Sequence, residues 1–412
     1  MHFLYNIALY IYYAFLSLIS PFNKRARQFT QGRRGLIKNL QSKDSSGQWI
    51  WFHCASLGEF EQARPLIESI KSQRTNCKVL LTFYSPSGYE VRRDYKQADL
   101  VTYLPFDTPK NAQTFIQLFD IKLAGFVKYE FWLNYLTELN ERHIPVISVS
   151  SIFRKHQLFF RPFGGFYRGF LKRFNYLMVQ DQASVELLKS IGITNVSLTS
   201  DTRFDRVYQL AKNPKSINQV QEFKGSQSVI VFGSVWPSDM RIIAPILDDL
   251  MSLELRVIIA PHQIEASFLN EVIQSLSNPY QLHSNMVTDR DSQSILIIDS
   301  IGLLSSIYQY ANIAYVGGAF NGTLHNILEP STYGIPVLFG DHPTNQKFKE
   351  ATDLCELGGA KPIKSSQQLL DEIELLMQNT SIMQKRGNVC RNYVEENTGA
   401  TDKIMELISA YL

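Results

Sequence analysis

Short apolar runs alternate with amphipathic stretches along most of the chain. The runs are continuous rather than alternating in polarity, as in strands buried on both faces of a parallel sheet. Helix-length segments lie between them, and this βα alternation is typical of parallel sheets wound by helices. The pattern predicts strands at residues 49–55, 78–84, 100–105, 121–128, 144–150, 176–180, 196–199, 228–234, 255–260, 294–299, 312–316 and 335–339.

A polar stretch with Pro and Gly at 211–227, AKNPKSINQVQEFKGSQ, separates two similar halves and is the best candidate for a linker. We therefore expect an α/β protein with two doubly wound, Rossmann-like domains, 23–212 and 213–412. The last helix is the one element that could return to the first domain. Two such domains facing each other place a cleft between the carboxyl ends of their strands, where ligands of these folds bind.

The first 22 residues form a separate segment. No charged residue occurs from Phe3 to Phe22, and about 20 uncharged residues suffice to span a bilayer. Basic residues follow the segment instead of preceding it and no cleavage site is evident, which argues against a signal peptide. We predict a membrane anchor at 1–22 that either spans the bilayer or lies in its interface, with the rest of the chain cytoplasmic. The alternative is a first helix buried on the core.

Composition excludes some classes of protein. The chain has 412 residues, a net charge of +3 and four cysteines that are far apart. This argues against a disulfide framework or a zinc site, suits a reducing compartment and does not indicate nucleic-acid binding. The one D-x-D sequence, Asp289 to Asp291, lies in a polar loop and is interpreted as solvated surface rather than a metal site.

A lone carboxylate stands between the first predicted strand and the helix that follows it. In WFHCASLGEFEQARPLI, Glu59 comes just before an amphipathic pattern begins. Ser56 and Glu59 fit the S-x-x-E capping box, in which both side chains bond backbone amides at the start of a helix. The same position would let an ionised Glu59 act as general base toward a bound hydroxyl. Spacing alone leaves both interpretations open.

The segment YVGGAFNGTLHNILEPSTYGIPVLFG, residues 315–340, has the features of a nucleotide site. A predicted strand ends in two glycines, and a polar loop leads to His325 and Asn326, where we expect a helix to begin. Glycines let the backbone approach a ligand, and helix amides can hold a phosphate without metal. Glu329 could accept two hydrogen bonds from a ribose diol. The alternative is a Gly-rich turn with a solvated glutamate.

Two strand ends nearby place Ser234, in FGSVWPSD, and His262, in APH, at the same edge of the predicted sheet. DSIGLL, at 299–304, follows a further strand. His262 could meet a phosphate or a base, although a lone histidine after a strand is more often a polar surface residue.

The stretch 153–174, FRKHQLFFRPFGGFYRGFLKRF, interleaves basic and aromatic residues. Basic side chains could meet lipid phosphates while the aromatic rings enter the membrane interface. The alternative is an amphipathic helix whose rings pack on the sheet. The residues concerned are Arg154, Lys155, Arg161, Arg168, Lys172 and Arg173, with Phe159, Phe160, Phe163, Phe166 and Phe170.

Taken in order, these motifs resemble those of the 3-deoxy-D-manno-octulosonic acid (Kdo) transferases of lipopolysaccharide synthesis, glycosyltransferase family 30. The resemblance runs nearly end to end and includes the anchor, HCASLGEFEQARPLI, LTFYSPSGYE, YLPFDTP, EFWLN, TRFD, APH, YVGGAF and HNILEP. It implies the GT-B architecture, an inverting transfer without metal or other cofactor, CMP-Kdo as donor and a lipid A precursor (lipid IVA) as acceptor. It also implies the cytoplasmic face of the inner membrane as the location.

The resemblance also implies roles for individual residues. Glu59 matches the general base, and Arg203, in DTRFD, matches a basic residue that supports the charge of the leaving phosphate. The CMP contacts carry over to Pro261, His262, Ile301, Gly302, Leu303, Asn326, Ile327, Leu328 and Glu329, and the loop at Ser234 is expected to join them.

Three positions depart from the family pattern. Where many members have two carboxylates in E-T-E-L-W-P-N, this chain reads KYEFWLN, so that Lys128 takes the first position and Glu130 keeps the second. Lys128 could stabilise negative charge, or pair with Glu59 or Glu130. The G-G-H-N-P motif reads GTLHNI, which keeps His325 and loses one glycine and the proline. His262 stands where the family has an arginine, and a neutral histidine is a weaker clamp for phosphate.

Other functions are compatible with parts of the pattern. A GT-B enzyme that uses a UDP-sugar for transfer or epimerisation would share the architecture. An oxidoreductase is disfavoured, because the first strand–helix turn reads CASLGE and lacks G-x-G-x-x-G. A non-catalytic membrane-bound derivative of an enzyme is a third alternative, suggested by Lys128.

Overall fold

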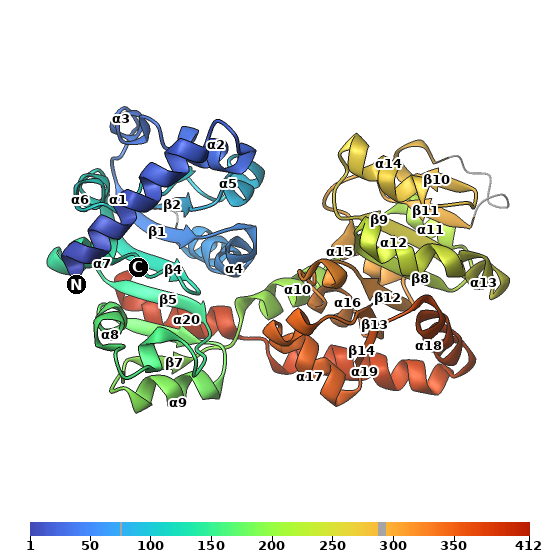
Figure 1. Cartoon of the computed structure of the whole chain (residues 1–412). Coiled ribbons are helices and arrows are strands. Elements are labelled where there is room, and N and C mark those ends of the chain that lie inside the picture. The colour runs from blue at the N-terminus through green and yellow to red at the C-terminus, as the bar shows by residue number, and fades with distance from the viewer. Residues whose placement is uncertain (75, 287–293) are drawn as a thin grey trace. The chain divides into compact units, whose positions relative to one another are not determined.

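The computed structural model describes residues 1–74, 76–286 and 294–412, so the D-x-D sequence at 289–291 lies outside the described residues. The chain forms two compact units (Figure 1): Met1–Asp205 together with Thr398–Leu412, and Arg206–Asn397. The first change of unit therefore comes at residue 205, before the polar stretch at 211–227. Part of that stretch is helical, because α10 (Thr202–Lys212) ends in its first two residues and α11 (Asn218–Lys224) lies within it.

The first unit contains a seven-stranded sheet in the order β3-β2-β1-β4-β5-β6-β7, with all neighbouring strands parallel. The order reverses between β1 and β4, as in doubly wound folds. The strands are β1 (Gln48–Cys54), β2 (Cys77–Phe83), β3 (Leu100–Tyr103), β4 (Asp120–Val127), β5 (Val146–Ser151), β6 (Tyr176–Val179) and β7 (Val196–Leu198).

The second unit repeats this plan in a seven-stranded parallel sheet of order β10-β11-β9-β8-β12-β13-β14. Here the order reverses between β8 and β12. The strands are β8 (Val229–Val235), β9 (Arg256–Pro261), β10 (Tyr280–Leu282), β11 (Ile295–Ile297), β12 (Ile313–Val316), β13 (Val337–Gly340) and β14 (Ala360–Ile363).

Each strand that the sequence predicts is present, with boundaries that differ by no more than two residues. The sequence missed β10 and β14, the two edge strands of the second sheet. All three residues of β10 are only partly buried, and β14 contains Lys361 and Pro362. Edge strands need bury only part of their surface, so a continuous apolar run is not required there.

Helices cover both faces of each sheet. In the first unit they are α1 (His2–Ile19), α2 (Lys24–Gln31), α3 (Leu36–Gln41), α4 (Leu57–Gln73), α5 (Pro86–Arg92), α6 (Pro109–Gln117), α7 (Leu133–Glu141), α8 (Gly165–Leu171), α9 (Gln182–Ser190) and α20 (Ala400–Ile408). Beyond α10 and α11, those of the second unit are α12 (Pro237–Ile243), α13 (Leu247–Ser252), α14 (Ala266–Gln274), α15 (Leu304–Ile307), α16 (Leu328–Ser331), α17 (Lys349–Leu357), α18 (Ser366–Gln378) and α19 (Thr380–Glu396).

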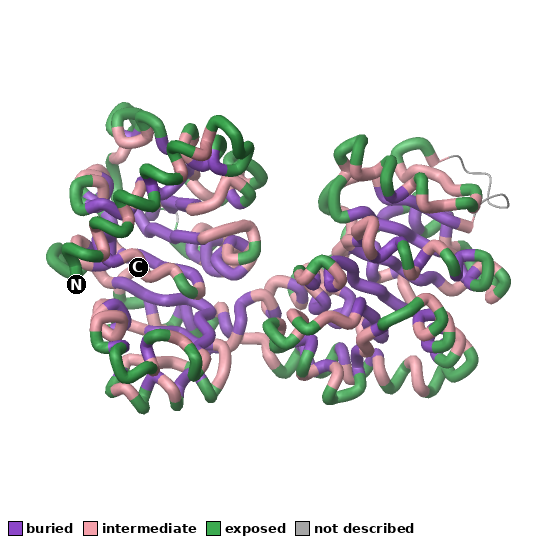
Figure 2. The backbone as a smooth tube through the Cα atoms, viewed as in Figure 1, coloured by how far each residue is buried: buried purple, intermediate pink, exposed green. Residues whose placement is uncertain are grey.

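The strands are the most buried part of each unit (Figure 2). Along β1, Trp49 and Trp51 face the core shared with α6 and α7, whereas Ile50 and Phe52 face the core shared with α4 and α20. Alternate residues of a strand point to opposite faces, so a continuous apolar run fills two cores at once. This explains why the strands read as unbroken hydrophobic segments.

The N-terminal helix α1 packs along the first unit through polar groups of one face. The Tyr5 hydroxyl donates to Oδ2 of Asp107 at 2.6 Å, the amide of Asp107 donates to the Tyr13 hydroxyl at 3.2 Å, and Nδ2 of Asn134 donates to Oδ1 of Asn6 at 2.9 Å. The rest of the helix is open to solvent, and its exposed large apolar residues are Phe3, Leu4, Ile7, Tyr10, Ile11, Tyr12, Phe15 and Leu18. A helix buried on the core, the alternative from sequence, is therefore not what forms.

Most rings of the 153–174 segment face inward, which is the alternative interpretation that the sequence offered. Phe159 and Phe170 are buried, and Phe160 and Phe166 pack against the same core, so the expectation that they enter a membrane interface is wrong. Phe163 differs, since it is 96% exposed. The rings pack inward because the segment folds as a turn, a 3-10 helix and the seven-residue α8 over the end of the sheet, rather than as one long surface helix.

Candidate active site

The candidate residues collect at the carboxyl ends of the strands where the order of each sheet reverses. In the first unit, Glu59 follows β1, and Lys128 and Glu130 follow β4. In the second unit, Ser234 is the last residue but one of β8, and the two-glycine loop follows β12. The loops leave in opposite directions at such a point and open a crevice above the sheet, which is where open α/β sheets bind their ligands.

Glu59 lies in the first turn of α4, but the predicted capping box does not form. Ser56 is the N-cap residue and its side chain makes no bond to a helix amide. The Ser56 hydroxyl instead donates to Oε2 of Glu59. The capping box is therefore wrong, because the two side chains bond to each other rather than to the backbone. Glu59 is partly exposed, and one oxygen of its carboxylate is fixed by this hydrogen bond near the carboxyl end of β1.

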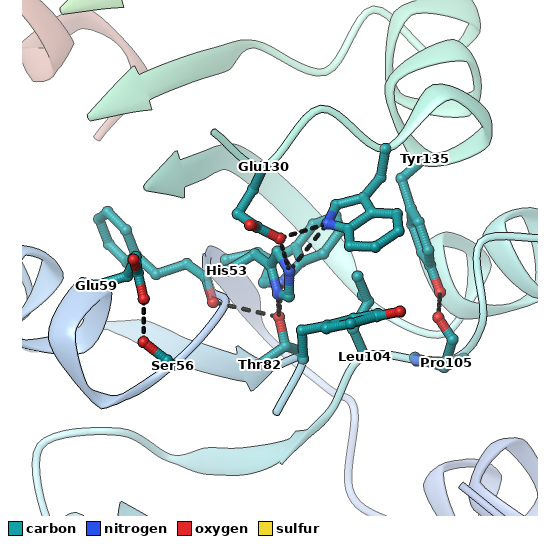
Figure 3. A network of polar contacts seen from close by, with 12 residues as sticks. His53, Ser56, Glu59, Thr82, Leu104, Pro105, Glu130 and Tyr135 are labelled. Carbon is teal, nitrogen blue, oxygen red and sulfur yellow. Dashed lines mark hydrogen bonds and ion pairs between the residues drawn. The ribbon is translucent and has the colours of Figure 1, made fainter. Parts of the chain in front are cut away.

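Glu130 is held by a network that reaches into the core (Figure 3). Its Oε2 lies 3.1 Å from Nε2 of His53 and accepts a 2.7 Å hydrogen bond from Nε1 of Trp132. His53 is fully buried on β1, and its Nδ1 lies 2.8 Å from the Thr82 hydroxyl on β2. Nε1 of Trp51 donates to the same hydroxyl at 2.8 Å. The Glu130 carboxylate follows β4, and its orientation thus depends on residues of the neighbouring strands β1 and β2.

Lys128, the first residue after β4, has a constrained backbone. Its φ is +58°, a conformation that side chains other than Gly rarely adopt. The Lys128 amide donates to the Val149 carbonyl at 2.9 Å, and the Ser151 hydroxyl donates to the Lys128 carbonyl at 2.7 Å. Among the residues that the structure describes, Lys128 forms no ion pair with Glu59 or Glu130, so that predicted pairing is absent.

Arg203 is anchored by a buried aspartate. Its Nε and terminal nitrogen donate to Oδ2 of Asp201 at 3.0 and 2.9 Å, and its amide donates to Oδ1 at 2.9 Å. Nε2 of Gln62 also donates to Oδ2, at 2.8 Å. Burial by itself would raise the pKa of Asp201, but the charges of Arg203 and, more weakly, Lys128 lower it below its usual value. The guanidinium therefore stays beside an ionised carboxylate, 20% exposed.

In the second unit a buried carboxylate organises the loops after β8 and β12. Oδ2 of Asp239 accepts from the amides of Trp236 and Gly318, at 2.8 and 3.0 Å, and Oδ1 accepts from the Tyr315 hydroxyl at 2.9 Å. A Cβ at Gly317 would lie 2.7 Å from Oδ2 of Asp239, so only glycine fits there. Asp239 thus fixes the distance between the two loops.

Trp236, His262 and His325 form an aromatic cluster at this point. The His262 ring lies 4.5 Å from the Trp236 ring and 4.2 Å from the His325 ring, with interplanar angles of 20° and 28°. Nε1 of Trp236 donates to Nε2 of His325 at 2.9 Å. Since Nε2 accepts, the proton of the neutral ring lies on Nδ1. Burial, and then the neighbouring His262, lower the pKa of His325 to about 4. Burial also lowers the pKa of His262.

The Asn326–Glu329 segment turns tightly in front of this cluster. Nδ2 of Asn326 donates to Oε1 of Glu329 at 3.3 Å, and Oδ1 of Asn326 accepts from the amide of Leu328 at 3.2 Å. Ile327 and Leu328 are buried, so their backbone rather than their side chains faces the loop. The helix start expected at His325 and Asn326 is wrong, because α16 begins at Leu328 and ends at Ser331. Four residues provide little dipole to hold a phosphate.

The remaining predicted nucleotide contacts occupy strand ends of the second unit. Pro261 ends β9 and is buried, and the amide of His262 donates to the Val235 carbonyl at 2.9 Å. Ser234 has a φ of +53° where the pairing of β8 with β9 shifts by one residue. The Ile301–Leu303 turn is solvent-accessible at its start: Ile301 is 81% exposed and Gly302 has a φ of +83°.

Over residues 1–74, 76–286 and 294–412, no three His, Cys, Asp or Glu side chains come together as metal ligands.

Known proteins share this sequence pattern. Residues 28–206, nearly all of the contiguous first unit after α1, match the family model described as 3-deoxy-D-manno-octulosonic-acid transferase. A protein of that name from Haemophilus influenzae is 24% identical over 413 residues, 97% of this chain and 95% of that protein. Another from Aquifex aeolicus is 26% identical over 333 residues, 80% of this chain and 86% of that protein. The chain belongs to the 3-deoxy-D-manno-octulosonic-acid transferase family. It is an enzyme of the glycosyltransferase class.

Solved structures confirm the predicted architecture of this transferase. A UDP-GlcNAc 2-epimerase from Neisseria meningitidis superposes with a TM-score of 0.62 at 16% identity, over 88% of this chain and 100% of that one. MurG from Acinetobacter baumannii gives a TM-score of 0.53 at 14% identity, over 89% and 100% of the two chains. The transferase therefore has the GT-B type of fold, built from two doubly wound units.

The sequence did not single out several residues that organise the site. Glu130 is held by His53, Thr82 and Trp132. Arg203 is held by Asp201, and the loops after β8 and β12 are held by Asp239. Each of these residues lies in one of the motifs above or at a strand end, near a predicted site residue. That proximity in the sequence is the signal by which they could be found. Their partners lie on other strands, and a linear pattern does not show which strands become neighbours.

Proposed function

We propose that this transferase moves Kdo from CMP-Kdo to a hydroxyl of a lipid A precursor, with inversion at the anomeric carbon. A bond forms between the acceptor oxygen and the anomeric carbon, and the bond from that carbon to the phosphate oxygen breaks, so that CMP leaves. The observation that carries the proposal is the Glu59 carboxylate at the switch point of the unit that matches the family model.

Glu59 takes the proton of the attacking hydroxyl. The Ser56 hydroxyl occupies one carboxylate oxygen, which fixes the orientation of the group and leaves the second oxygen for the acceptor. A positioned carboxylate of this kind typically contributes about 10²–10⁴-fold as a general base. Arg203 is bonded to the ionised Asp201, and among the described residues Lys128 forms no ion pair with Glu59 or Glu130. We expect both cations to stabilise the negative charge that develops on the leaving phosphate.

The nucleotide binds in the second unit at the loops after β8, β9, β11 and β12. The neutral His262 presents a ring face, and the neutral His325 carries its proton on Nδ1. A neutral donor can bond a phosphate oxygen without the desolvation cost of a second buried charge. Glu329, oriented by Asn326, accepts from the ribose hydroxyls. Pro261, Ile301, Gly302, Leu303, Ile327 and Leu328 contribute backbone contacts around the base, and Ser234 lies at the end of β8.

The transferase works at the cytoplasmic face of the inner membrane, with α1 lying in the bilayer interface. Within the described residues, α1 is the helix that is long and apolar enough to cross a membrane, with a mean hydropathy of 1.4 over 18 residues. The hydrogen bonds of Tyr5, Asn6 and Tyr13 to the first unit support an orientation along the protein surface, with the apolar face outward. The exposed Phe163 supports a second contact near the basic residues of its segment.

The decisive experiment is incubation of the protein with CMP-Kdo and a tetra-acylated lipid A precursor, followed by mass analysis of the lipid. A mass gain of one or more Kdo residues and release of CMP are expected. Parallel reactions with UDP-sugars test the alternative donor class, and release of UDP instead of CMP would contradict the proposal.

A pair of neighbouring variants tests the role of Glu59. Glu59→Gln should lower the transfer rate at least about 10²-fold while CMP binding, measured by calorimetry, is unchanged. Glu61→Gln is the matched control, because Glu61 lies on the same helix but pairs with Arg92 and Arg64. Retained activity in Glu59→Gln would remove the base assignment.

A further inference from the structure

The hydrogen bonds around His53 determine where its proton lies. Trp51 Nε1–H can only donate, so the Thr82 hydroxyl accepts from it. The single proton of that hydroxyl is then available to Nδ1 of His53 at 2.8 Å, or to the Phe52 carbonyl at 3.4 Å. The shorter contact is the stronger one. Nδ1 therefore accepts. Nε1–H of Trp132 lies 3.2 Å from Nε2 of His53 but only 2.7 Å from Oε2 of Glu130, so the indole donates to the carboxylate. Nε2 faces the same carboxylate oxygen at 3.1 Å and therefore carries the proton of the ring.

This proton position has a consequence for Glu130. Nε2–H of His53 and Nε1–H of Trp132 both point at Oε2 of Glu130, at 3.1 and 2.7 Å. A carboxylate oxygen that accepts from two N–H donors is fixed in direction. Among the described residues, Oε1 of Glu130 accepts no hydrogen bond, although its side chain is only 13% exposed. One oxygen is thus saturated by the protein, and the other is left for a group from outside.

An ordinary buried histidine would explain only part of this arrangement. Bonds to both ring nitrogens would satisfy a core histidine wherever its partners came from. Here one partner of His53 is the Glu130 carboxylate, at the point where the strand order reverses. The other is the Thr82 hydroxyl, which accepts from the indole of Trp51 and therefore donates its own proton to His53. The series Trp51–Thr82–His53–Glu130 runs from the core to the carboxyl end of the sheet. Its donors and acceptors are matched as far as Oε2 of Glu130, and Oε1 is the acceptor that the described residues leave unmatched.

We infer that His53 and Thr82 are positioning residues, which fix the direction of the Glu130 carboxylate so that its Oε1 receives a hydroxyl of the sugar substrates. Thr82 keeps the His53 proton on Nε2, and His53, together with Trp132, aims the carboxylate. Neither His53 nor Thr82 reaches the substrate, since both are fully buried. The inference rests on the proposed transferase function for the identity of the substrate, but not for the state of the histidine.

The kinetic test compares Thr82→Val, which removes the hydroxyl at nearly constant volume, with Thr82→Ser, which keeps it. Thr82→Val should lower kcat/KM for Kdo transfer about tenfold, and Thr82→Ser should recover most of the rate. In a Glu130→Gln background, Thr82→Val should change the rate less than about twofold, because the hydroxyl acts through the carboxylate. An equal loss in both backgrounds would overturn the inference, since it would indicate a general packing defect.

A second measurement uses the wild-type protein without substrate. Nitrogen-15 spectra of histidine-labelled protein, with His53 assigned through His53→Phe among the eight histidines, should show a neutral ring protonated on Nε2. A ring protonated on Nδ1 alone would contradict the inference even if transfer is observed. If the wild type transfers no Kdo but His53 shows the Nε2–H form, the substrate assignment fails and the positioning network stands.

Trp132→Phe covers the case in which Thr82→Val does not fold. Trp132 is only partly buried and donates to the same oxygen. Its loss should lower the rate in the Glu130 background and leave the Glu130→Gln background nearly unchanged. The same loss in both backgrounds would again argue against the network.

Discussion

The Tyr5 hydroxyl of α1 donates a 2.6 Å hydrogen bond to Oδ2 of Asp107, a residue 102 positions along the chain. Asp107 is buried and also accepts from the amides of Asn134 and Tyr135, at 3.4 and 3.1 Å. The polar groups on one face of α1 are hydrogen-bonded to the protein. Lipid therefore cannot surround the helix on all sides while these bonds are present. The contact therefore favours an interfacial helix over a spanning one.

Charges on the outer face of α1 should weaken membrane binding without unfolding the protein. Ile11→Glu and Phe15→Glu replace residues that are 65% and 57% exposed. Each should lower the partition of the protein into anionic vesicles about tenfold or more, because apolar burial is lost and charge repulsion is added. Co-sedimentation with vesicles measures this, and Gln113→Glu, an exposed position on α6, is the control. Alkaline carbonate should release the wild type from membranes, and resistance to it would indicate a spanning helix.

The contact at Asp107 should make the stability of the first unit depend on pH. Burial raises the pKa of Asp107 to about 6, even though hydrogen bonds from Tyr5 and two amides lower it in part. Between pH 4 and 6 the folded chain therefore holds a proton that the unfolded chain has lost, so the free energy of unfolding falls as the pH rises through this window. Asp107→Asn should remove this contribution. The difference in unfolding free energy between wild type and variant, measured by urea titration at pH 4.5 and 7, should shrink or reverse at the higher pH. A constant difference would contradict the raised pKa.

His325 should have the opposite effect in the second unit. Its pKa of about 4 lies below the ordinary value of 6.5, so the unfolded chain binds a proton between these values that the folded chain does not. The free energy of unfolding should fall as the pH drops from 6.5 to 4, by roughly 3 kcal/mol for this group. His325→Gln keeps an acceptor for Trp236 and should reduce the slope. His156→Gln, at an exposed site in the first unit, should leave the slope unchanged.

Asp205 should hold the returning C-terminal helix in place. Its carboxylate accepts from the amides of Gly399 and Thr401, both at 2.6 Å, and from the Thr401 hydroxyl. It thereby caps α20 at the point where the chain re-enters the first unit. Asp205→Asn should cost about 1–2 kcal/mol, as the loss of a helix cap does, and hydrogen exchange of the α20 amides should speed up first. Asp402→Asn, an exposed change in the first turn of the same helix, should have a smaller effect.

The apolar runs of the sequence determined the strands, because a strand buried on both faces must be apolar throughout. They determined much less at the sheet edge, where β10 and β14 were missed, and at the turn after His325, where tertiary contacts replaced the expected helix with a four-residue one. The Ser56–Glu59 spacing was read correctly as a helix start. The choice between amide and carboxylate as partner for the Ser56 hydroxyl was made by the local fold.

What the sequence by itself determined is the α/β alternation, the two-unit organisation and the motifs that mark the family, since each depends on residues close together in the chain. Only the tertiary structure decided how the site is held. His53 meets Glu130 across 77 positions, and Trp236 meets His325 across 89. Such contacts follow from the order and register of the strands, and these are set by the packing of the whole sheet rather than by any local pattern.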